Sequence, residues 1–223
     1  MFDEVQGSAA FGTPASSRAA PRLDIYPGVK RLLDLALAIC VAPVAGPLIL
    51  VLALMVMADG GSPFYSQPRL GKNGKIFRLW KLRSMVPNAD ALLQLHLAQD
   101  PAARAEWDST QKLRRDPRIT RIGRILRKYS LDELPQLWNV LTGEMSIVGP
   151  RPIFPEQRAL YPGTAYFDFR PGLTGLWQIT ERNNSSFAQR ATYDNSYAMT
   201  VSLLTDLRII FKTVEVVFRG TGL

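Results

Sequence analysis

The strongest feature of the hydrophobic pattern is an uncharged, apolar run near the start of the chain. Residues 35–58 form 24 consecutive positions without a charged side chain, between Asp34 and Asp59. At about 1.5 Å per residue, a straight helix of this length extends roughly 36 Å, enough to cross a bilayer. A buried helix of a soluble protein is the alternative, but runs this long are rare in soluble cores. The pattern therefore predicts a membrane-embedded helix.

Two features favour a hairpin that enters and leaves the membrane on one side. Pro43 and Pro47 lie near the middle of the run with Gly46 between them, and proline removes a helix hydrogen bond and bends the chain. Each half is then only about 12–15 residues long, which suits a segment that dips into one leaflet. Both ends are also basic, and basic flanks tend to stay cytoplasmic. The flanking residues are Arg18, Arg22, Lys30 and Arg31 before the run, and Arg69, Lys72, Lys75, Arg78, Lys81 and Arg83 after it. We predict a re-entrant helix-break-helix hairpin over residues 29–60, with a kinked spanning helix as the remaining alternative.

The segments on either side of this run differ from it in pattern. Residues 1–28 contain a stretch of Gly, Ala, Ser and Pro with few large apolar side chains, which predicts a disordered tail without the features of a secretory signal. Residues 62–85 partly alternate apolar and basic side chains around Asn73-Gly74, which predicts a small β-hairpin. We expect residues 61–223 to form one cytoplasmic, membrane-associated catalytic domain.

The rest of this domain is expected to be helical. Residues 87–113 are rich in Ala, Leu and Gln, and residues 116–142 carry apolar side chains on one helix face with arginines around the other. Residues 201–218 are strongly apolar with interspersed charges, which predicts either an interfacial amphipathic helix or a core helix. The predicted fold class is therefore α+β, mostly helical.

The charge balance narrows the range of partners. There are 27 Lys+Arg against 19 Asp+Glu, a formal net charge of +8, which predicts anionic partners such as phosphates, anionic lipid or nucleic acid. The single cysteine, Cys40, excludes an intramolecular disulfide framework, and the single histidine, His96, excludes multi-histidine metal sites. Acid–base or nucleophilic chemistry then falls most naturally to carboxylates.

Two adjacent carboxylates, Asp132 and Glu133, are the candidates for that chemistry. They have an ordinary structural interpretation, because Ser130 and Glu133 have the spacing of a helix capping box. Alternatively Asp132 is the helix N-cap and Pro135 lies in the first turn. Their setting favours a functional role, because the chain around them is dense in basic side chains. These are Lys112, Arg114, Arg115, Arg118, Arg121, Arg124, Arg127 and Lys128, followed by Arg151 and Arg170 at Pro/Gly turns and then by Arg182. Guanidinium groups bind phosphate oxygens in bidentate fashion, and a carboxylate can ligate a divalent cation or act as a nucleophile.

Several long ordered strings give the chain a family resemblance. It resembles the bacterial sugar transferases, monotopic polyprenyl-phosphate phosphoglycosyltransferases, over about residues 29–219. The matching strings include Lys30 to Asp34, Phe77 to Met85, Asp116 to Gly123, Leu126 to Leu137, Gly143 to Pro152 and Arg170 to Gln178. The stretch Pro101 to Trp107 also resembles the stand-alone enzymes that begin exopolysaccharide synthesis with galactose-1-phosphate.

The resemblance implies a reaction and a set of roles. The family transfers a sugar-1-phosphate from a UDP-sugar to undecaprenyl phosphate at the bacterial inner membrane, releasing UMP and requiring Mg²⁺. Asp132 matches the family's nucleophile, which forms a covalent phosphosugar intermediate, and Glu133 matches its metal-associated partner. Lys81, Arg127, Arg151 and Arg182 match positions near the phosphates, and Arg83 and Arg170 lie in matching motifs. The chain departs from the family at Ala42-Pro43, where Ser-Pro is frequent, and at Glu181, where Gly is frequent.

Other interpretations predict different behaviour. A non-catalytic membrane adaptor that binds anionic lipid would not need the acidic pair. A nucleic-acid binder could use the arginines of residues 112–128, but no nucleic-acid motif or aromatic platform accompanies them, so we expect no nucleic-acid partner. The resemblance to the stand-alone enzymes favours galactose and leaves glucose and N-acetylated sugars open, and a homo-oligomer is compatible with the sequence.

Overall fold

A computed structural model describes residues 26–58, 60–110, 113–180 and 186–219 of the chain. Within these ranges helices predominate, and two small two-stranded sheets accompany them. This confirms the predicted mostly helical α+β class and the small β-hairpin. The helices are α1 (Tyr26–Met57), α2 (Ala89–Gln99), α3 (Pro101–Thr110), α4 (Arg121–Lys128), α5 (Gln136–Thr142), α6 (Leu176–Ile179), α7 (Arg190–Thr200) and α8 (Leu203–Arg219). The strands are β1 (Phe64–Leu70), β2 (Ile76–Leu82), β3 (Ser146–Val148) and β4 (Gly172–Thr174), and the 3₁₀ turns are η1 (Lys72–Gly74), η2 (Leu131–Glu133), η3 (Pro155–Leu160) and η4 (Ala165–Asp168).

The hairpin β1–β2 is antiparallel and turns where the sequence predicts. Asn73 and Gly74 have φ values of 57° and 72°, the left-handed conformation that an Asn-Gly turn favours. Side chains on β2 alternate between the two faces, so that Phe77 and Leu79 are buried while Ile76 is exposed. Lys81, which is half-buried, lies on the same face of β2 as Phe77 and Leu79.

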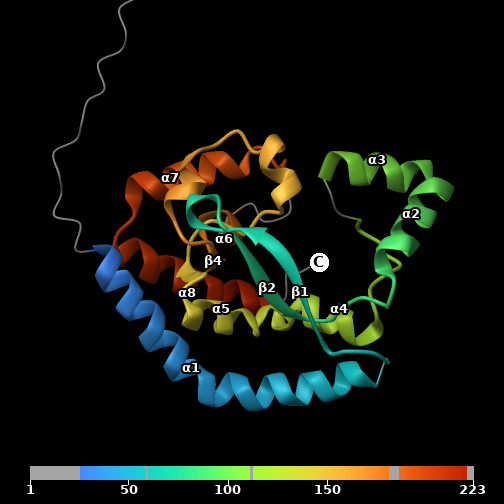
Figure 1. Cartoon of the computed structure of the whole chain (residues 1–223), viewed down its shortest axis with the longest axis horizontal. Coiled ribbons are helices and arrows are strands. Elements are labelled where there is room, and N and C mark those ends of the chain that lie inside the picture. Colours follow the sequence, from blue (N-terminus) through green and yellow to red (C-terminus); the bar gives the residue numbers. More distant parts are fainter. Residues whose placement is uncertain (1–25, 59, 111–112, 181–185, 220–223) are drawn as a thin grey trace, which may run out of the picture.

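The elements are arranged in layers on one side of the long helix α1. Figure 1 shows α1 along one side of the molecule, with α4, α5 and α8 between it and the β1–β2 hairpin. Apolar side chains of α1, β2 and α5 share one core cluster, which includes Ala38, Ala45, Phe77, Leu79 and Val140. The sheet β3–β4 is parallel and packs against α8. The end of α1 joins a second cluster with Leu82 and Leu126.

Helix α1 contains both prolines of the apolar run. The chain is helical from Tyr26 to Met57, through Pro43 and Pro47, and Figure 1 shows that its axis changes direction part-way along. A bend is expected there, because each proline removes one helix hydrogen bond. By length and composition α1 could cross a membrane, and only 22% of its most apolar window is buried in the protein. The re-entrant hairpin therefore stays a prediction, and the break takes the form of a bend within one helix.

Polar contacts attach the first half of α1 to the rest of the protein. The Asp34 carboxylate is 3% exposed and accepts hydrogen bonds from the Ser146 hydroxyl at 3.0 Å and the Ile147 amide at 2.8 Å. Arg31 donates to two backbone carbonyls at the end of α5, at 2.6 and 3.0 Å. Arg31 and Asp34, which precede the apolar run, therefore attach α1 to α5 and β3.

A second buried carboxylate, Asp206, joins α1 to the C-terminal helices. Asp206 lies in the first turn of α8 and is 1% exposed. It accepts hydrogen bonds from the Tyr26 hydroxyl at 2.5 Å and the Tyr197 hydroxyl at 2.7 Å, and it pairs with the Lys30 ammonium at 2.5 Å. Three helices, α1, α7 and α8, therefore meet at this one carboxylate.

Helix α8 combines the two alternatives predicted for residues 201–218. Its inner face packs into the protein through Ile209, whereas large apolar side chains on the other side are exposed. These exposed residues are Leu203, Leu204, Phe211, Val214 and Phe218. An interfacial location for α8 stays a prediction.

Candidate active site

The acidic pair lies on the short turn η2 between α4 and α5. Neither predicted capping arrangement forms: α5 begins at Gln136 after Pro135, and the Ser130 amide donates to the Arg127 carbonyl rather than to Glu133. The reason is that Ser130 adopts a left-handed conformation (φ 57°), which ends α4 and starts a separate 3₁₀ turn. Asp132 is only 7% exposed. The two carboxylates are therefore held apart from any helix N-cap and face the hairpin.

Lys81 from β2 is the central cation of the site. Its Nζ lies 2.8 Å from Glu133 Oε1 and 3.7 Å from Asp132 Oδ2. Its side chain is 14% exposed, because it lies on the inward face of β2. One lysine thus contacts both members of the acidic pair.

A buried amide, Asn139, keeps the pair opposite this lysine. Asn139 of α5 is fully buried, accepts a hydrogen bond from the Trp80 amide at 3.1 Å and donates to the Arg78 carbonyl at 2.7 Å. Through these two bonds the Asn139 amide pairs with the backbone of β2, as a neighbouring strand would. Since η2 leads directly into α5, fixing α5 on β2 also fixes the acidic pair near Lys81.

The surroundings affect the two carboxylates differently. Burial raises the pKa of Asp132 above its usual range, and Lys81 and Arg127 only partly oppose this. Burial would also raise the pKa of Glu133, but Lys81 and Arg151 outweigh it and hold the pKa below its usual range. Burial lowers the pKa of Lys81, yet the two carboxylates more than compensate, so its pKa is raised. Glu133 is thus the ion-paired anion, and Asp132 the less stabilised, more basic carboxylate.

Two further predicted arginines lie near the pair. The Arg151 guanidinium, in the loop after β3, lies 3.1 Å from Glu133 Oε1 and is one-third exposed. Arg127, at the end of α4, acts on Asp132 through its charge. The structure therefore brings together Lys81, Arg127 and Arg151 around the acidic pair.

The remaining predicted cations are placed elsewhere. Arg83 donates to the carbonyls of Val56, Gly60 and Ser62, where it closes the end of α1. Arg170 is exposed and donates to the Gly143 carbonyl at 2.7 Å, beyond the far end of α5. Their predicted phosphate contacts gain no support from this geometry. Arg182 lies outside the described residues, as do Lys112, Glu181 and residues 1–25 of the predicted tail.

Arg69 is a site residue that the sequence analysis counted only as a flanking charge. It is 9% exposed, and its guanidinium lies over the Phe154 ring, 3.1 Å from the ring centroid. Its Nη2 donates to Gln67 at 3.0 Å, whereas its Nη1 is buried without a hydrogen-bond acceptor among the described residues. Burial, followed by the nearby Arg151 charge, lowers the pKa of Arg69 to about 10. A buried donor without a partner is costly, and an anion in the adjoining cleft would offset that cost.

The hairpin register offered a signal for Arg69. Residues directly opposite each other on antiparallel strands lie on the same face, and Arg69 is paired with Phe77. Counting back from the Asn73-Gly74 turn therefore places Arg69 on the inward face that carries Lys81.

These groups surround a small cleft in which cations outnumber anions. Its volume is about 40 Å³, and its polar lining consists of Arg69, Lys81, Glu133, Gln136 and Arg151. Three cations thus face Glu133, with Asp132 next to it. Such a cleft suits an anion with several oxygens, and a buried carboxylate beside it can act as a nucleophile. An anion-binding cleft beside a carboxylate is the arrangement that phosphoryl transfer through a covalent intermediate requires.

The acidic pair also fits a divalent cation completed by substrate. Mg²⁺ is usually held by one or two carboxylates together with substrate phosphates and water. The described residues contain no cluster of three or more Asp, Glu, His or Cys side chains that could hold a metal by itself. Asp132 and Glu133 would supply the two carboxylates, and the phosphates of a bound substrate would supply further ligands.

Comparison with known proteins identifies the family. A family model described as bacterial sugar transferase matches residues 25–220. The chain is 48% identical to the exopolysaccharide production protein ExoY of Sinorhizobium fredii, over 86% of this chain and 87% of the relative. It is 47% identical to a UDP-galactose-lipid carrier transferase of Erwinia amylovora and 45% identical to an undecaprenyl-phosphate galactose phosphotransferase of Salmonella typhimurium. The match covers 87% of this chain but 41% of each of these two relatives, so the chain spans less than half of their length. The protein belongs to the bacterial sugar transferase family, which confirms the resemblance seen in its sequence.

Proposed function

We propose that the protein transfers a sugar-1-phosphate, galactose-1-phosphate in the first instance, from a UDP-sugar to undecaprenyl phosphate. UMP is released, and the product is the lipid-linked sugar with which exopolysaccharide synthesis begins. The observation that carries this proposal is the buried Asp132–Glu133 pair among Lys81, Arg127, Arg151 and Arg69. The names of the relatives support the substrates, because they specify UDP-galactose and undecaprenyl phosphate.

The first step forms a covalent intermediate on Asp132. One carboxylate oxygen attacks the β-phosphorus of the UDP-sugar, and the bond from that phosphorus to the oxygen bridging the two phosphates breaks. UMP leaves with the bridging oxygen, and Asp132 becomes an acyl phosphate that carries the sugar. Asp132 suits this role better than Glu133, whose Oε1 is occupied by both Lys81 and Arg151.

The second step uses the same site for the lipid acceptor. A phosphate oxygen of undecaprenyl phosphate attacks the phosphorus of the intermediate, the bond to Asp132 breaks, and the free carboxylate returns. Lys81, Arg69 and Arg151 offset the charge on the phosphate oxygens in both steps. A bound Mg²⁺, held by Asp132 and Glu133, would supply further charge neutralisation at the diphosphate. Because UMP leaves before the acceptor reacts, one small cleft serves two bulky anions in turn.

We place this chemistry at the cytoplasmic face of the bacterial inner membrane, with α1 as a monotopic, re-entrant anchor. Much of α1 exposes large apolar side chains to its surroundings. Further exposed apolar residues, Ile125, Trp138 and Phe211, lie on the helices α4, α5 and α8 that are layered next to α1. These surfaces favour contact with lipid over contact with water.

The re-entrant arrangement predicts a labelling pattern for α1. In a Cys40→Ser background, which removes the only cysteine, Gly28→Cys and Ser62→Cys place a single thiol at the start or the end of the helix. We expect a membrane-impermeant maleimide to label neither thiol in intact spheroplasts and both thiols after lysis. Labelling of one end in intact spheroplasts would identify a spanning helix and contradict the re-entrant model.

The proposed reaction is tested directly by UMP release. Purified protein in detergent or nanodiscs is supplied with undecaprenyl phosphate, Mg²⁺ and one UDP-sugar from a panel of galactose, glucose and N-acetylated sugars. We expect UMP to appear with UDP-galactose and to require the lipid acceptor for sustained turnover. The absence of UMP with every donor would favour the non-catalytic adaptor and overturn the proposal.

A further inference from the structure

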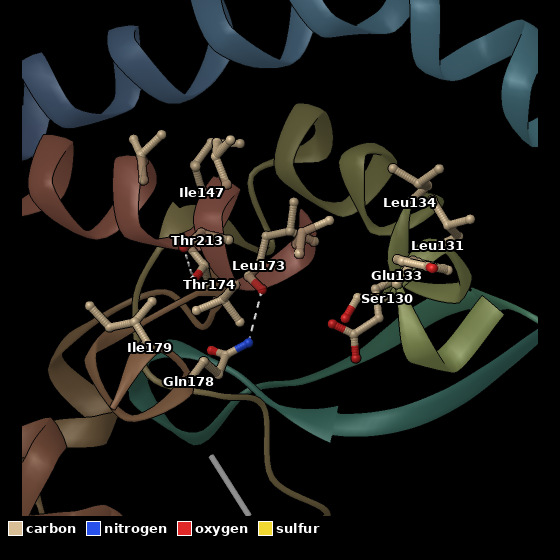
Figure 2. Close-up of a pocket in the computed structure, with 15 residues that line it drawn as sticks. Ser130, Leu131, Glu133, Leu134, Ile147, Leu173, Thr174, Gln178, Ile179 and Thr213 are labelled. Carbon is tan, nitrogen blue, oxygen red and sulfur yellow. Dashed lines mark hydrogen bonds between the residues drawn. The ribbon is translucent and has the colours of Figure 1, made fainter. Parts of the chain in front are cut away.

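A second pocket, larger and mostly apolar, adjoins the cationic cleft. It encloses about 250 Å³ between η2, the β3–β4 sheet, α6 and α8. Figure 2 shows Ser130, just before η2, and Glu133 of η2 on one side of it, and Leu173, Thr174 and Gln178 on the other. Most of its exposed lining is apolar and includes Leu134, Leu173, Ile179, Ile210, Val214 and Val217. Glu133 and Leu173 also line the cationic cleft, so the two spaces adjoin at these residues.

Polar groups form a small part of the exposed lining of this pocket, and several of them already have partners. The Thr174 and Thr213 hydroxyls are hydrogen-bonded at 2.7 Å, and Gln178 Nε2 donates to the Leu173 carbonyl at 3.0 Å. Gln178 Oε1 is buried without a donor among the described residues. A uracil ring presents two carbonyls and an N–H group along its edge, whereas most of this exposed lining is apolar. The lining therefore suits a hydrocarbon better than a nucleobase.

The combination of the two spaces matches an amphipathic ligand with an anionic head and a hydrocarbon tail. An apolar cavity of about 150 Å³ takes a six-carbon ring such as benzene, so about 250 Å³ accommodates roughly ten carbons, or two isoprene units. An acceptor phosphate in the cationic cleft would direct its adjoining carbons past Glu133 into the apolar pocket. The rest of the chain could continue over the exposed apolar side of α8, where Val214 is 50% exposed and Phe211 is 73% exposed.

We propose that this pocket binds the isoprene units next to the phosphate of the polyprenyl phosphate acceptor. The proposal rests on the function proposed above and adds a subsite that selects the lipid by its first carbons. It also gives α8 a part in acceptor binding, because Ile210, Val214 and Val217 supply one wall of the pocket.

Filling the pocket should impair the acceptor step alone. Val214→Trp adds bulk at a half-exposed lining position, and Lys212→Trp adds the same side chain at an exposed position of α8 outside the lining. We expect Val214→Trp to raise the KM for undecaprenyl phosphate about tenfold or more, which corresponds to the loss of a few buried methylene groups. Exchange of labelled UMP into UDP-galactose, which needs no acceptor, should be unchanged, and Lys212→Trp should change neither quantity.

The outcomes separate this proposal from the one on which it rests. If the parent protein catalyses UMP exchange and Val214→Trp leaves the acceptor KM unchanged, the pocket proposal fails while the proposed function stands. A raised KM for UDP-galactose with an unchanged acceptor KM would assign the pocket to the donor, and would also overturn it. If the parent protein catalyses no exchange, the proposed function fails, and the pocket proposal fails with it.

Photolabelling of the unmodified protein provides a test that does not depend on a variant. The probe is a polyprenyl phosphate with a diazirine on its second isoprene unit, and the labelled peptides are mapped by mass spectrometry. We expect label in residues 210–217 of α8 and at Leu173, with competition by undecaprenyl phosphate. Label confined to α1 would overturn the proposal.

Discussion

Asp132→Asn is expected to abolish turnover, lowering kcat by at least roughly 10³-fold. The substitution keeps the size of the side chain but removes the nucleophilic oxygen, so no acyl phosphate can form. The expected measurements are loss of UMP release and loss of a labelled protein adduct when radiolabelled UDP-galactose is supplied without acceptor. Mass spectrometry should find the adduct on Asp132 in the parent protein.

A surface carboxylate provides the matched control for this result. Asp108→Asn changes an exposed residue of α3 whose partner is Arg104 on the same helix, so it should leave the rate unchanged. Both variants should remain in the membrane fraction and unfold at a temperature close to that of the parent. Near-normal turnover by Asp132→Asn would remove Asp132 from the chemistry, as would product formation without any adduct at this position.

Lys81→Met is expected to produce the second largest loss, roughly 10²–10³-fold in kcat/KM. Lys81 is the cation that contacts both carboxylates, and methionine keeps much of its length without its charge. Its removal leaves Asp132 and Glu133 as adjacent, largely buried anions, and breaking a buried ion pair costs about 3–5 kcal/mol. We therefore expect a lower unfolding temperature as well as slower UMP release.

The control lysine for this experiment lies on the same hairpin. Lys75→Met removes an exposed lysine at the β1–β2 turn, with the same change in net charge. It should affect neither the rate nor the unfolding temperature. If Lys81→Met behaved like Lys75→Met, the ion pairs at the acidic pair would have no role in either catalysis or stability. A Lys81→Met protein that is less stable but fully active would limit Lys81 to a structural role.

The local patterns predicted the hairpin and most of the helices correctly. The Asn73-Gly74 turn and the alternation along β2 are short-range signals, and such signals determine a hairpin with little help from the rest of the chain. Lys81 could be placed beside the acidic pair only through family resemblance. Its contact with Glu133 joins residues 52 positions apart, and local sequence periodicity does not indicate contacts between residues so far apart in the chain.

Contacts that the sequence patterns did not indicate have physical causes as well. Ser130 and Glu133 have the spacing of a capping box, but the left-handed backbone at Ser130 ends α4 first and gives the carboxylates other partners. Arg83 and Arg69 look alike in the sequence, yet Arg83 binds backbone carbonyls at the end of α1 while Arg69 faces the cleft. The sequence shows where each charged side chain lies along the chain, whereas the partner that it binds is determined by tertiary packing.

The carboxylate of Asp206 has a consequence for the order of events during synthesis. Its partner Lys30 lies 176 residues earlier, in the first turns of the apolar helix. A nascent chain emerges N-terminus first, so α1 is made long before α8 has left the ribosome. Until α8 has been made, Lys30 and Tyr26 cannot bind the Asp206 carboxylate. The contacts of Lys30 and Tyr26 with Asp206 therefore form only after α8 has been made.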